Sequence, residues 1–95
     1  MVTQLIISKT KSEIPRPEII QLTKLMVEFF KQQSGFIKYE LFENGSSWAD
    51  KILWESQDQA LQGISAFKLS DIGRKMLSIL EPGLVVFTGT LVQLD

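Results

Sequence analysis

The sequence predicts one α+β domain, residues 1–95, in which helices cover one face of a four-stranded antiparallel sheet. Three observations support this prediction. The length of 95 residues is that of a single ordinary domain. Apolar residues alternate with polar residues in some segments and recur every three or four positions in others. The segments follow one another in the order strand, helix, strand, strand, helix, strand.

The first strand and helix are separated by a polar loop. Residues 2–8 are rich in β-branched side chains, which favour a strand. Pro15 and Pro17 delay the helix, and Pro17 suits its first turn because the missing N–H costs nothing there. Residues 18–33 have helical spacing. Their apolar side is wider than one sheet contact needs, which predicts a second contact, most simply with a partner subunit.

A hairpin is expected next. The strand that starts at Phe36 alternates apolar and polar residues, which places Phe36 and Tyr39 on opposite faces. Asn44-Gly45 is a strong signal for a hairpin turn. Residues 48–55 form the return strand, and its apolar face carries one ionisable side chain, Asp50.

The second half of the chain begins with a helix cap. Ser56 and Gln59 form a capping box, which predicts a helix that starts after Ser56. The helix breaks at residues 68–70, and Ser70 caps a further helical piece. The last strand is expected over residues 84–93. The whole order, βαββαβ, is that of a ferredoxin-like fold.

A sheet with helices on one face leaves its other face bare. Apolar residues make up 44% of this chain, so the bare face is expected to be apolar in part. A second copy of the same sheet, related by a two-fold axis, would cover it most simply. The sequence therefore predicts a homodimer in which two sheets pack together as a dimeric α/β barrel.

Composition excludes several kinds of chemistry. The chain has no cysteine and no histidine, which rules out disulfides, thiol nucleophiles, imidazole bases and histidine ligands for haem. No metal or other cofactor is expected. The net charge of −1, without a basic stripe, argues against nucleic acid as a partner. No apolar run approaches the roughly 18 residues of a membrane span. No signal peptide is recognisable, so a cytoplasmic location is expected.

Two segments resemble a known family. Residues 35–42 (GFIKYELF) and 52–56 (ILWES) are similar to antibiotic biosynthesis monooxygenase-like domains of the dimeric α/β-barrel superfamily. The resemblance in element order covers nearly the whole chain. It implies a homodimer, with activities in the superfamily that range from cofactor-independent quinol and anthrone monooxygenases to haem-degrading enzymes and lactone isomerases. Haem-degrading members use a histidine where this chain has Ala66 and Phe67, so haem degradation is not expected.

Five residues are candidates for a site. The resemblance implies that Trp54 lines a cavity and stacks on a flat ligand, although a buried tryptophan is equally a core residue. Tyr39 could orient or deprotonate a phenolic ligand, or be a sheet aromatic. Asp50 could be a catalytic base, or pair with Arg74 or with a lysine across the dimer. Arg74 could hold an anionic oxygen, or be solvated. Thr88 could donate a hydrogen bond to a ligand.

Three functions remain open from the sequence. The first is a cofactor-free oxygenase for a small aromatic compound, with Tyr39, Asp50 and Arg74 as catalytic residues and Trp54 and Thr88 as ligand-binding residues. The second is a non-catalytic homodimer that binds a small ligand or serves as an accessory module. The third is an isomerase of a small metabolite, which needs only one acid–base group.

Overall fold

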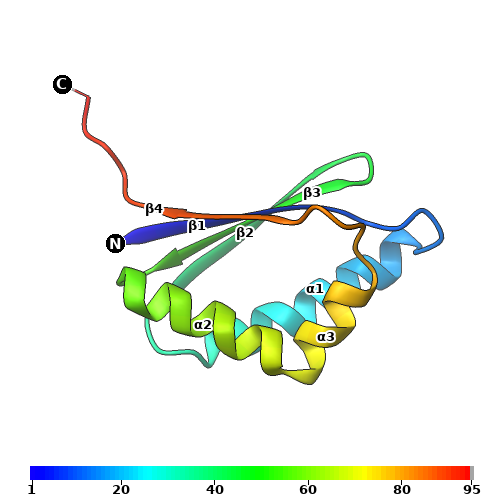
Figure 1. Ribbon diagram of the computed structural model, residues 1–95, viewed down its shortest axis with the longest axis horizontal. Coiled ribbons are helices and arrows are strands. Elements are labelled where there is room, and N and C mark those ends of the chain that lie inside the picture. Colours follow the sequence, from blue (N-terminus) through cyan, green and yellow to red (C-terminus); the bar gives the residue numbers. More distant parts are fainter. Residues whose placement is uncertain (95) are drawn as a thin grey trace.

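One sheet and three helices form two layers in the computed structural model, which describes residues 1–94 (Figure 1). The elements are β1 (Val2–Lys9), α1 (Arg16–Lys31), β2 (Phe36–Asn44), β3 (Ser47–Trp54), α2 (Gln57–Leu69), α3 (Asp71–Ser78) and β4 (Val85–Gly89). The strands are antiparallel and lie in the order β2-β3-β1-β4. All the helices cover the same face, called the inner face below. This arrangement confirms the predicted α+β, ferredoxin-like fold.

The predicted caps and turn are present. The hydroxyl of Ser56 accepts a hydrogen bond from the Gln59 N–H at 3.2 Å, and this bond begins α2. In the same way Ser70 accepts from the Gly73 N–H at 3.0 Å and begins α3. Gly45 takes a positive φ of 61° as the first residue of the two-residue turn between β2 and β3. The structure thus confirms the predicted hairpin turn and the predicted starts of the two later helices.

The last strand is shorter than predicted. The sequence pattern predicts a strand over residues 84–93, whereas β4 ends at Gly89 and residues 90–94 project away from the sheet (Figure 1). The reason is the pairing partner. Because β4 runs antiparallel to β1, Gly89 lies opposite Thr3, and β1 itself begins only one residue earlier. Beyond Gly89 the strand therefore has almost no neighbour in its own chain.

The predicted alternation of β2 is wrong at its start. Phe36 and Tyr39 both face the helices, because a register shift between Phe36 and Lys38 inserts one extra residue opposite β3. The Phe36 ring packs edge-on against Trp54, with ring centroids 6.0 Å apart and planes at 90°. A β-bulge thus allows two aromatic residues three positions apart to share the inner face.

The inner face under α2 is fully packed around Trp54. Its ring is 0% exposed and contacts Phe30 edge-on, with centroids 6.0 Å apart. Its indole N–H donates to the Gln4 side-chain oxygen at 3.2 Å. The amide of Gln4 in turn donates to the Thr88 hydroxyl at 3.3 Å and to the Ala60 carbonyl at 3.5 Å. Every polar atom that this tryptophan and glutamine bury therefore has a partner.

This network makes Gln4 a residue on which stability depends. We expect Gln4→Leu to lower the free energy of unfolding by about 1–3 kcal/mol, because it leaves the buried Trp54 N–H without an acceptor. Thr88→Val is the matched control, since it removes only one partner of the same amide and should have a smaller effect. Urea unfolding measures both variants. Equal losses in the two variants would contradict the assignment.

Candidate functional site

Tyr39 and Asp50 form a hydrogen-bonded pair on the inner face, near the edge of the sheet. Asp50 lies on β3, opposite Leu41 of β2. Tyr39 lies two residues before Leu41 and is opposite Ile52, so Tyr39 and Asp50 are diagonal neighbours on the same face. The Tyr39 hydroxyl donates to one carboxylate oxygen of Asp50. Asp50 is only 7% exposed. Within residues 1–94, no lysine or arginine forms an ion pair with it. A single hydroxyl therefore holds this buried carboxyl.

The environment changes the acidity of both groups. Burial raises the pKa of Asp50 to about 6, although the hydrogen bond from Tyr39 acts in the opposite direction. Burial also raises the pKa of Tyr39, and the neighbouring Asp50 carboxylate raises it further. The phenolic proton thus stays on Tyr39, while Asp50 changes its protonation state near neutral pH. A carboxyl with this property can take up a proton in a catalytic cycle.

Asp50 borders a narrow cavity between the sheet and helices α1 and α3. The cavity has a volume of about 40 Å³. Six of the residues that line it are apolar and lie in the core, namely Ile6, Ile19, Met26, Trp48, Met76 and Ile79. Sites for small organic ligands usually measure roughly 300–1,000 Å³. The cavity in this conformation is therefore too small for an aromatic ligand.

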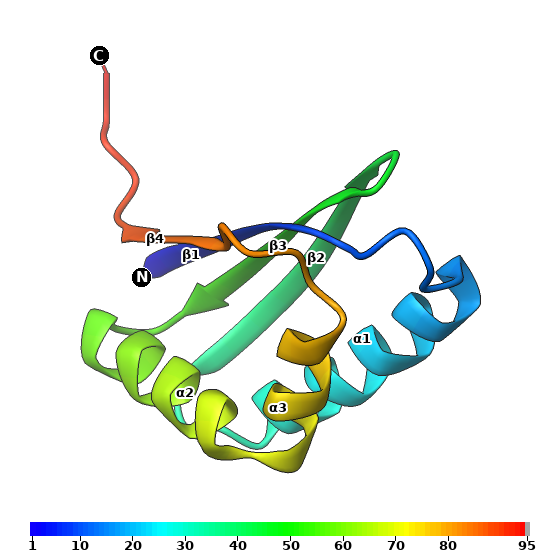
Figure 2. The same ribbon diagram turned by 45° about the vertical axis from the view of Figure 1, so that its right-hand side comes forward.

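A larger groove lies on the other side of the pair. It is open, has a volume of about 460 Å³ and runs between α1 and the edge strand β2. Figure 2 shows α1 beneath this strand. Tyr39 borders the groove, and Leu41 and Thr23 border both the groove and the cavity. Ile20 and Val27, on the wide apolar side of α1, also line the groove.

The structure does not bring the other predicted residues to this pair. Arg74 is exposed on α3, where it donates to Asp71 at 2.7 Å and to the Leu69 carbonyl at 2.9 Å. Trp54 and Thr88 belong to the hydrogen-bonded network of Gln4, in the filled part of the core. Trp54 also packs closely against Gly63, where a side-chain carbon would overlap its ring. The ligand-binding and catalytic roles of these three residues stay predictions.

Sequence reasoning did not identify Trp48 as a neighbour of the cavity. Trp48 is 5% exposed, and its indole N–H donates to the Thr10 hydroxyl at 3.3 Å. The spacing in the sequence does place Trp48 beside Asp50, because residues two positions apart in a strand lie on the same face. The sequence could not show that α3 reaches across to close a cavity at this end of the sheet.

Neither a metal-binding cluster nor a membrane-spanning helix is found in the described part of the chain. Residues 1–94 bring together no group of three or more acidic side chains that could hold a metal ion. None of the helices in this range is both long enough and apolar enough to cross a membrane.

Comparison with known proteins relates this fold to others. No protein-family model matches the sequence, and no curated protein matches it. Solved structures do match. SnoaB of Streptomyces nogalater, a cofactor-independent oxygenase, superposes with a TM-score of 0.82 and 14% identity, over 98% of this chain and 94% of its own.

Two further structures have the same architecture. An antibiotic biosynthesis monooxygenase gives a TM-score of 0.75 at 13% identity, over 98% of this chain and 100% of its own. A hypothetical Arabidopsis thaliana protein gives 0.77 at 12% identity, over 99% of this chain and 90% of its own. At these identities the likeness is one of fold. It confirms the resemblance to antibiotic biosynthesis monooxygenase-like domains at the level of the fold.

Proposed function

On the premise that the chain has the antibiotic biosynthesis monooxygenase-like fold, we propose that it is a cofactor-independent monooxygenase. Its substrate would be a small aromatic compound of the quinol or anthrone type, and it would act as a cytoplasmic homodimer. The observation that carries the proposal is the Asp50 carboxyl, which is buried, has no cation beside it and has a pKa raised to about 6. Such a group is a base suited to neutral pH.

The groove and the Tyr39–Asp50 pair suggest how a substrate loses its proton. The volume of the groove between α1 and β2 is that of a small-ligand site, and its surface is mostly apolar, with Lys24, Glu28 and Lys31 of α1 as its charged residues. Tyr39 borders that groove and donates to Asp50. The substrate proton passes to the Tyr39 oxygen while the Tyr39 proton passes to the carboxylate. Asp50 thereby acts as the base through a neutral hydroxyl, and the substrate becomes an anion.

The anion then reacts with dioxygen. In an anthrone the reacting carbon is a CH₂ group, and its carbanion adds one end of dioxygen to form a peroxide anion. Protonation of that anion by the Asp50–Tyr39 pair gives a hydroperoxide. The hydroperoxide loses water, so that one oxygen atom stays on carbon as a carbonyl and the other leaves with both hydrogens. The substrate supplies all the electrons, and the protein supplies the proton transfer.

The test is oxygen uptake by the purified protein with a panel of anthrones and quinols. We expect uptake to match product formation one to one, with one ¹⁸O atom in the carbonyl product when labelled dioxygen is used. Rates equal to those without protein would reject the enzymatic function. Product formation without oxygen would instead support the isomerase that the sequence leaves open.

One observation favours a second candidate function. The groove between α1 and β2 is open, so a ligand bound there stays in contact with water. A non-catalytic homodimer that binds a ligand in this groove needs no closed site, whereas an oxygenase gains from one. Saturable binding of the same aromatic compounds, seen by calorimetry without any turnover, would support this alternative.

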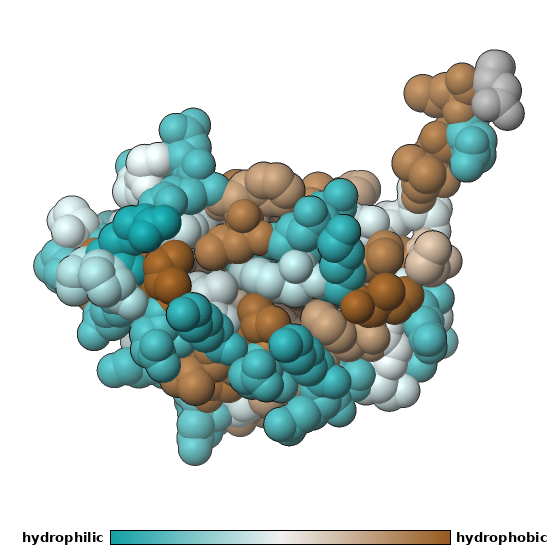
Figure 3. All heavy atoms as spheres, turned by 180° about the vertical axis from the view of Figure 1, so that it is seen from behind, coloured by the Kyte–Doolittle hydropathy of each residue, from teal (hydrophilic) through white to brown (hydrophobic). Residues whose placement is uncertain are grey.

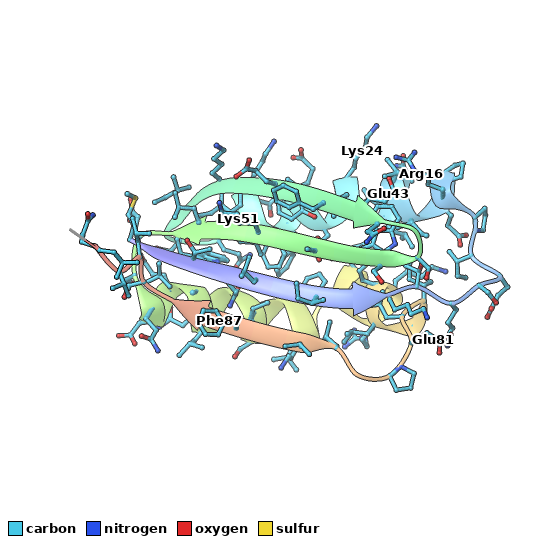
Figure 4. All side chains as sticks on the ribbon, turned by 90° about the horizontal axis from the view of Figure 1, so that it is seen from above. Arg16, Lys24, Glu43, Lys51, Glu81 and Phe87 are labelled. Carbon is cyan, nitrogen blue, oxygen red and sulfur yellow. The ribbon has the colours of Figure 1, made fainter. Side chains whose placement is uncertain are left out.

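The homodimer is proposed from the outer face of the sheet, the face away from the helices. Four apolar side chains on it are between 44% and 61% exposed, namely Ile7, Phe42, Val85 and Phe87. Figure 4 looks onto this face and shows Phe87 on β4 at its edge. The projecting residues 90–94 add further exposed apolar side chains (Figure 3). A second copy packed sheet against sheet would cover such a surface with its own identical patch.

We expect Phe87→Glu to prevent dimer formation, because it would place a charge without a partner in the contact between the sheets. Native mass spectrometry at low micromolar concentration should give about twice 10.8 kDa for the unchanged protein and a single chain for the variant. Leu61→Glu is the control, since Leu61 is 49% exposed on α2, in the helix layer. A monomeric unchanged protein, or a Phe87→Glu variant that remains a dimer, would contradict this arrangement.

A further inference from the structure

We propose that the cavity beside Asp50 is a binding site for a small apolar gas molecule, dioxygen, separate from the groove that takes the aromatic compound. The proposal rests on the monooxygenase function for its biological meaning, but the site itself is defined by the geometry of the cavity. Its volume of about 40 Å³ exceeds the roughly 10–15 Å³ that a water-sized molecule needs. It is far below the volume that a ring system requires.

The chemistry of the lining favours an apolar occupant over water. A buried water molecule needs two to four polar partners. The hydroxyls of Thr10 and Thr23 border the cavity, but they donate to the Ser46 carbonyl at 3.4 Å and to the Ile19 carbonyl at 2.8 Å. The Asp50 carboxyl accepts from Tyr39 through one oxygen, and the Ser8 hydroxyl is the remaining polar group of the lining. Ten of the fourteen residues in the lining are apolar, with aliphatic, methionine or indole side chains. An apolar molecule would contact this larger part of the wall, and cavities with apolar walls bind xenon.

The position of the cavity would bring bound dioxygen close to the acid–base pair and to the substrate. Asp50 borders the cavity, Tyr39 borders the groove, and a hydrogen bond joins the two side chains. Leu41 and Thr23 border both spaces. A gas molecule in the cavity and an aromatic anion in the groove would therefore lie on opposite sides of the same acid–base pair.

The three methionines of the chain provide the test. Met26 and Met76 border the cavity, whereas Met1 is 77% exposed at the chain terminus. The protein is labelled with ¹³C at the methionine methyl groups and studied by NMR under increasing xenon pressure, with xenon as the probe for dioxygen. We expect saturable shifts of the Met26 and Met76 methyl signals and only a small, linear shift of Met1. Equal, linear shifts of all three signals would overturn the proposal.

A variant that fills the cavity, together with a matched control, tests whether xenon binds at this site. Ser8 borders the cavity and is 9% exposed, so Ser8→Val adds methyl groups to the cavity on a strand that favours β-branched residues. Thr3→Val makes a similar change on the outer face of the same strand. We expect the xenon-induced shifts to be lost in Ser8→Val and kept in Thr3→Val. Shifts that persist in both variants would place xenon elsewhere and reject the site.

The experiment also separates this proposal from the proposed function. Xenon binding requires no turnover, so saturable shifts in a protein that oxidises no aromatic compound would support the gas site and reject the enzyme. Turnover without xenon binding would support the enzyme and reject the gas site. If both are correct, Ser8→Val raises the apparent KM for dioxygen several-fold and leaves the KM for the aromatic substrate unchanged.

Discussion

Asp50→Asn is expected to lower kcat/KM for the aromatic substrate by about 10²–10⁴-fold, the usual contribution of a positioned general base. The amide has almost the same shape and can still accept the Tyr39 hydrogen bond, but it cannot take up a proton. In the unchanged protein kcat/KM should rise about tenfold per pH unit below 6 and level off above it, because Asp50 must be ionised to act as a base. Steady-state oxygen uptake between pH 4.5 and 8 measures both effects.

The matched control is Asp58→Asn, which changes an exposed carboxyl in the first turn of α2. It should leave kcat/KM and its pH profile unchanged. Tyr39→Phe should keep the fold but lose most of the rate, since it removes the hydroxyl through which the proton passes. An Asp50→Asn variant with full activity would remove Asp50 from the mechanism and, with it, the main support for the proposed function.

The second large effect is on stability, and it has the opposite sign to that of most carboxyls. The pKa of Asp50 is raised from its ordinary value of 3.8 to about 6 in the folded protein, so the folded state binds more protons than the unfolded state between these values. The contribution of Asp50 to stability is therefore complete below pH 3.8 and is lost as the pH rises from there through 6. Because one pKa unit corresponds to about 1.4 kcal/mol, the whole contribution is about 3 kcal/mol, of which the unchanged protein should lose about 2 kcal/mol on going from pH 4 to pH 7.5.

Urea unfolding at several pH values from 5 to 7.5 isolates the later part of this loss, about 1 kcal/mol. The chain has no histidine, which would otherwise titrate in the same range. The fall in the free energy of unfolding with rising pH should disappear in Asp50→Asn and persist in Asp58→Asn. A stability that does not depend on pH in this range would mean that Asp50 titrates as an ordinary surface carboxyl and is not the buried group described here.

The sequence predicted the fold well because its strongest signals are local. The serines that cap α2 and α3 and the glycine in the hairpin turn act on their own neighbours, so they can be read from the chain. The end of β4 could not be predicted in this way. It depends on where β1 starts, more than eighty residues earlier, and the apolar pattern continues past that point.

The site was predictable only in part. Tyr39 and Asp50 were both candidates, but the sequence favoured Arg74 or a lysine as the partner of Asp50 because a buried carboxylate usually pairs with a cation. The bulge that follows Phe36 keeps both Phe36 and Tyr39 on the inner face, and no alternation pattern reveals a bulge. Arg74 is kept on the surface by Asp71, which lies three residues away on the same helix and forms a contact that needs no tertiary structure.

The two tryptophans lie at different ends of the inner face, and this gives the protein two separate optical reporters. Trp48 borders the cavity near an ionisable carboxyl, whereas Trp54 is enclosed by aromatic rings and bonded to Gln4. In a Trp54→Phe variant the remaining fluorophore should respond to collisional quenching by dissolved gas and to the ionisation of Asp50. In a Trp48→Phe variant the emission should follow unfolding alone. Occupancy of the cavity and integrity of the core can thus be monitored independently without any added label.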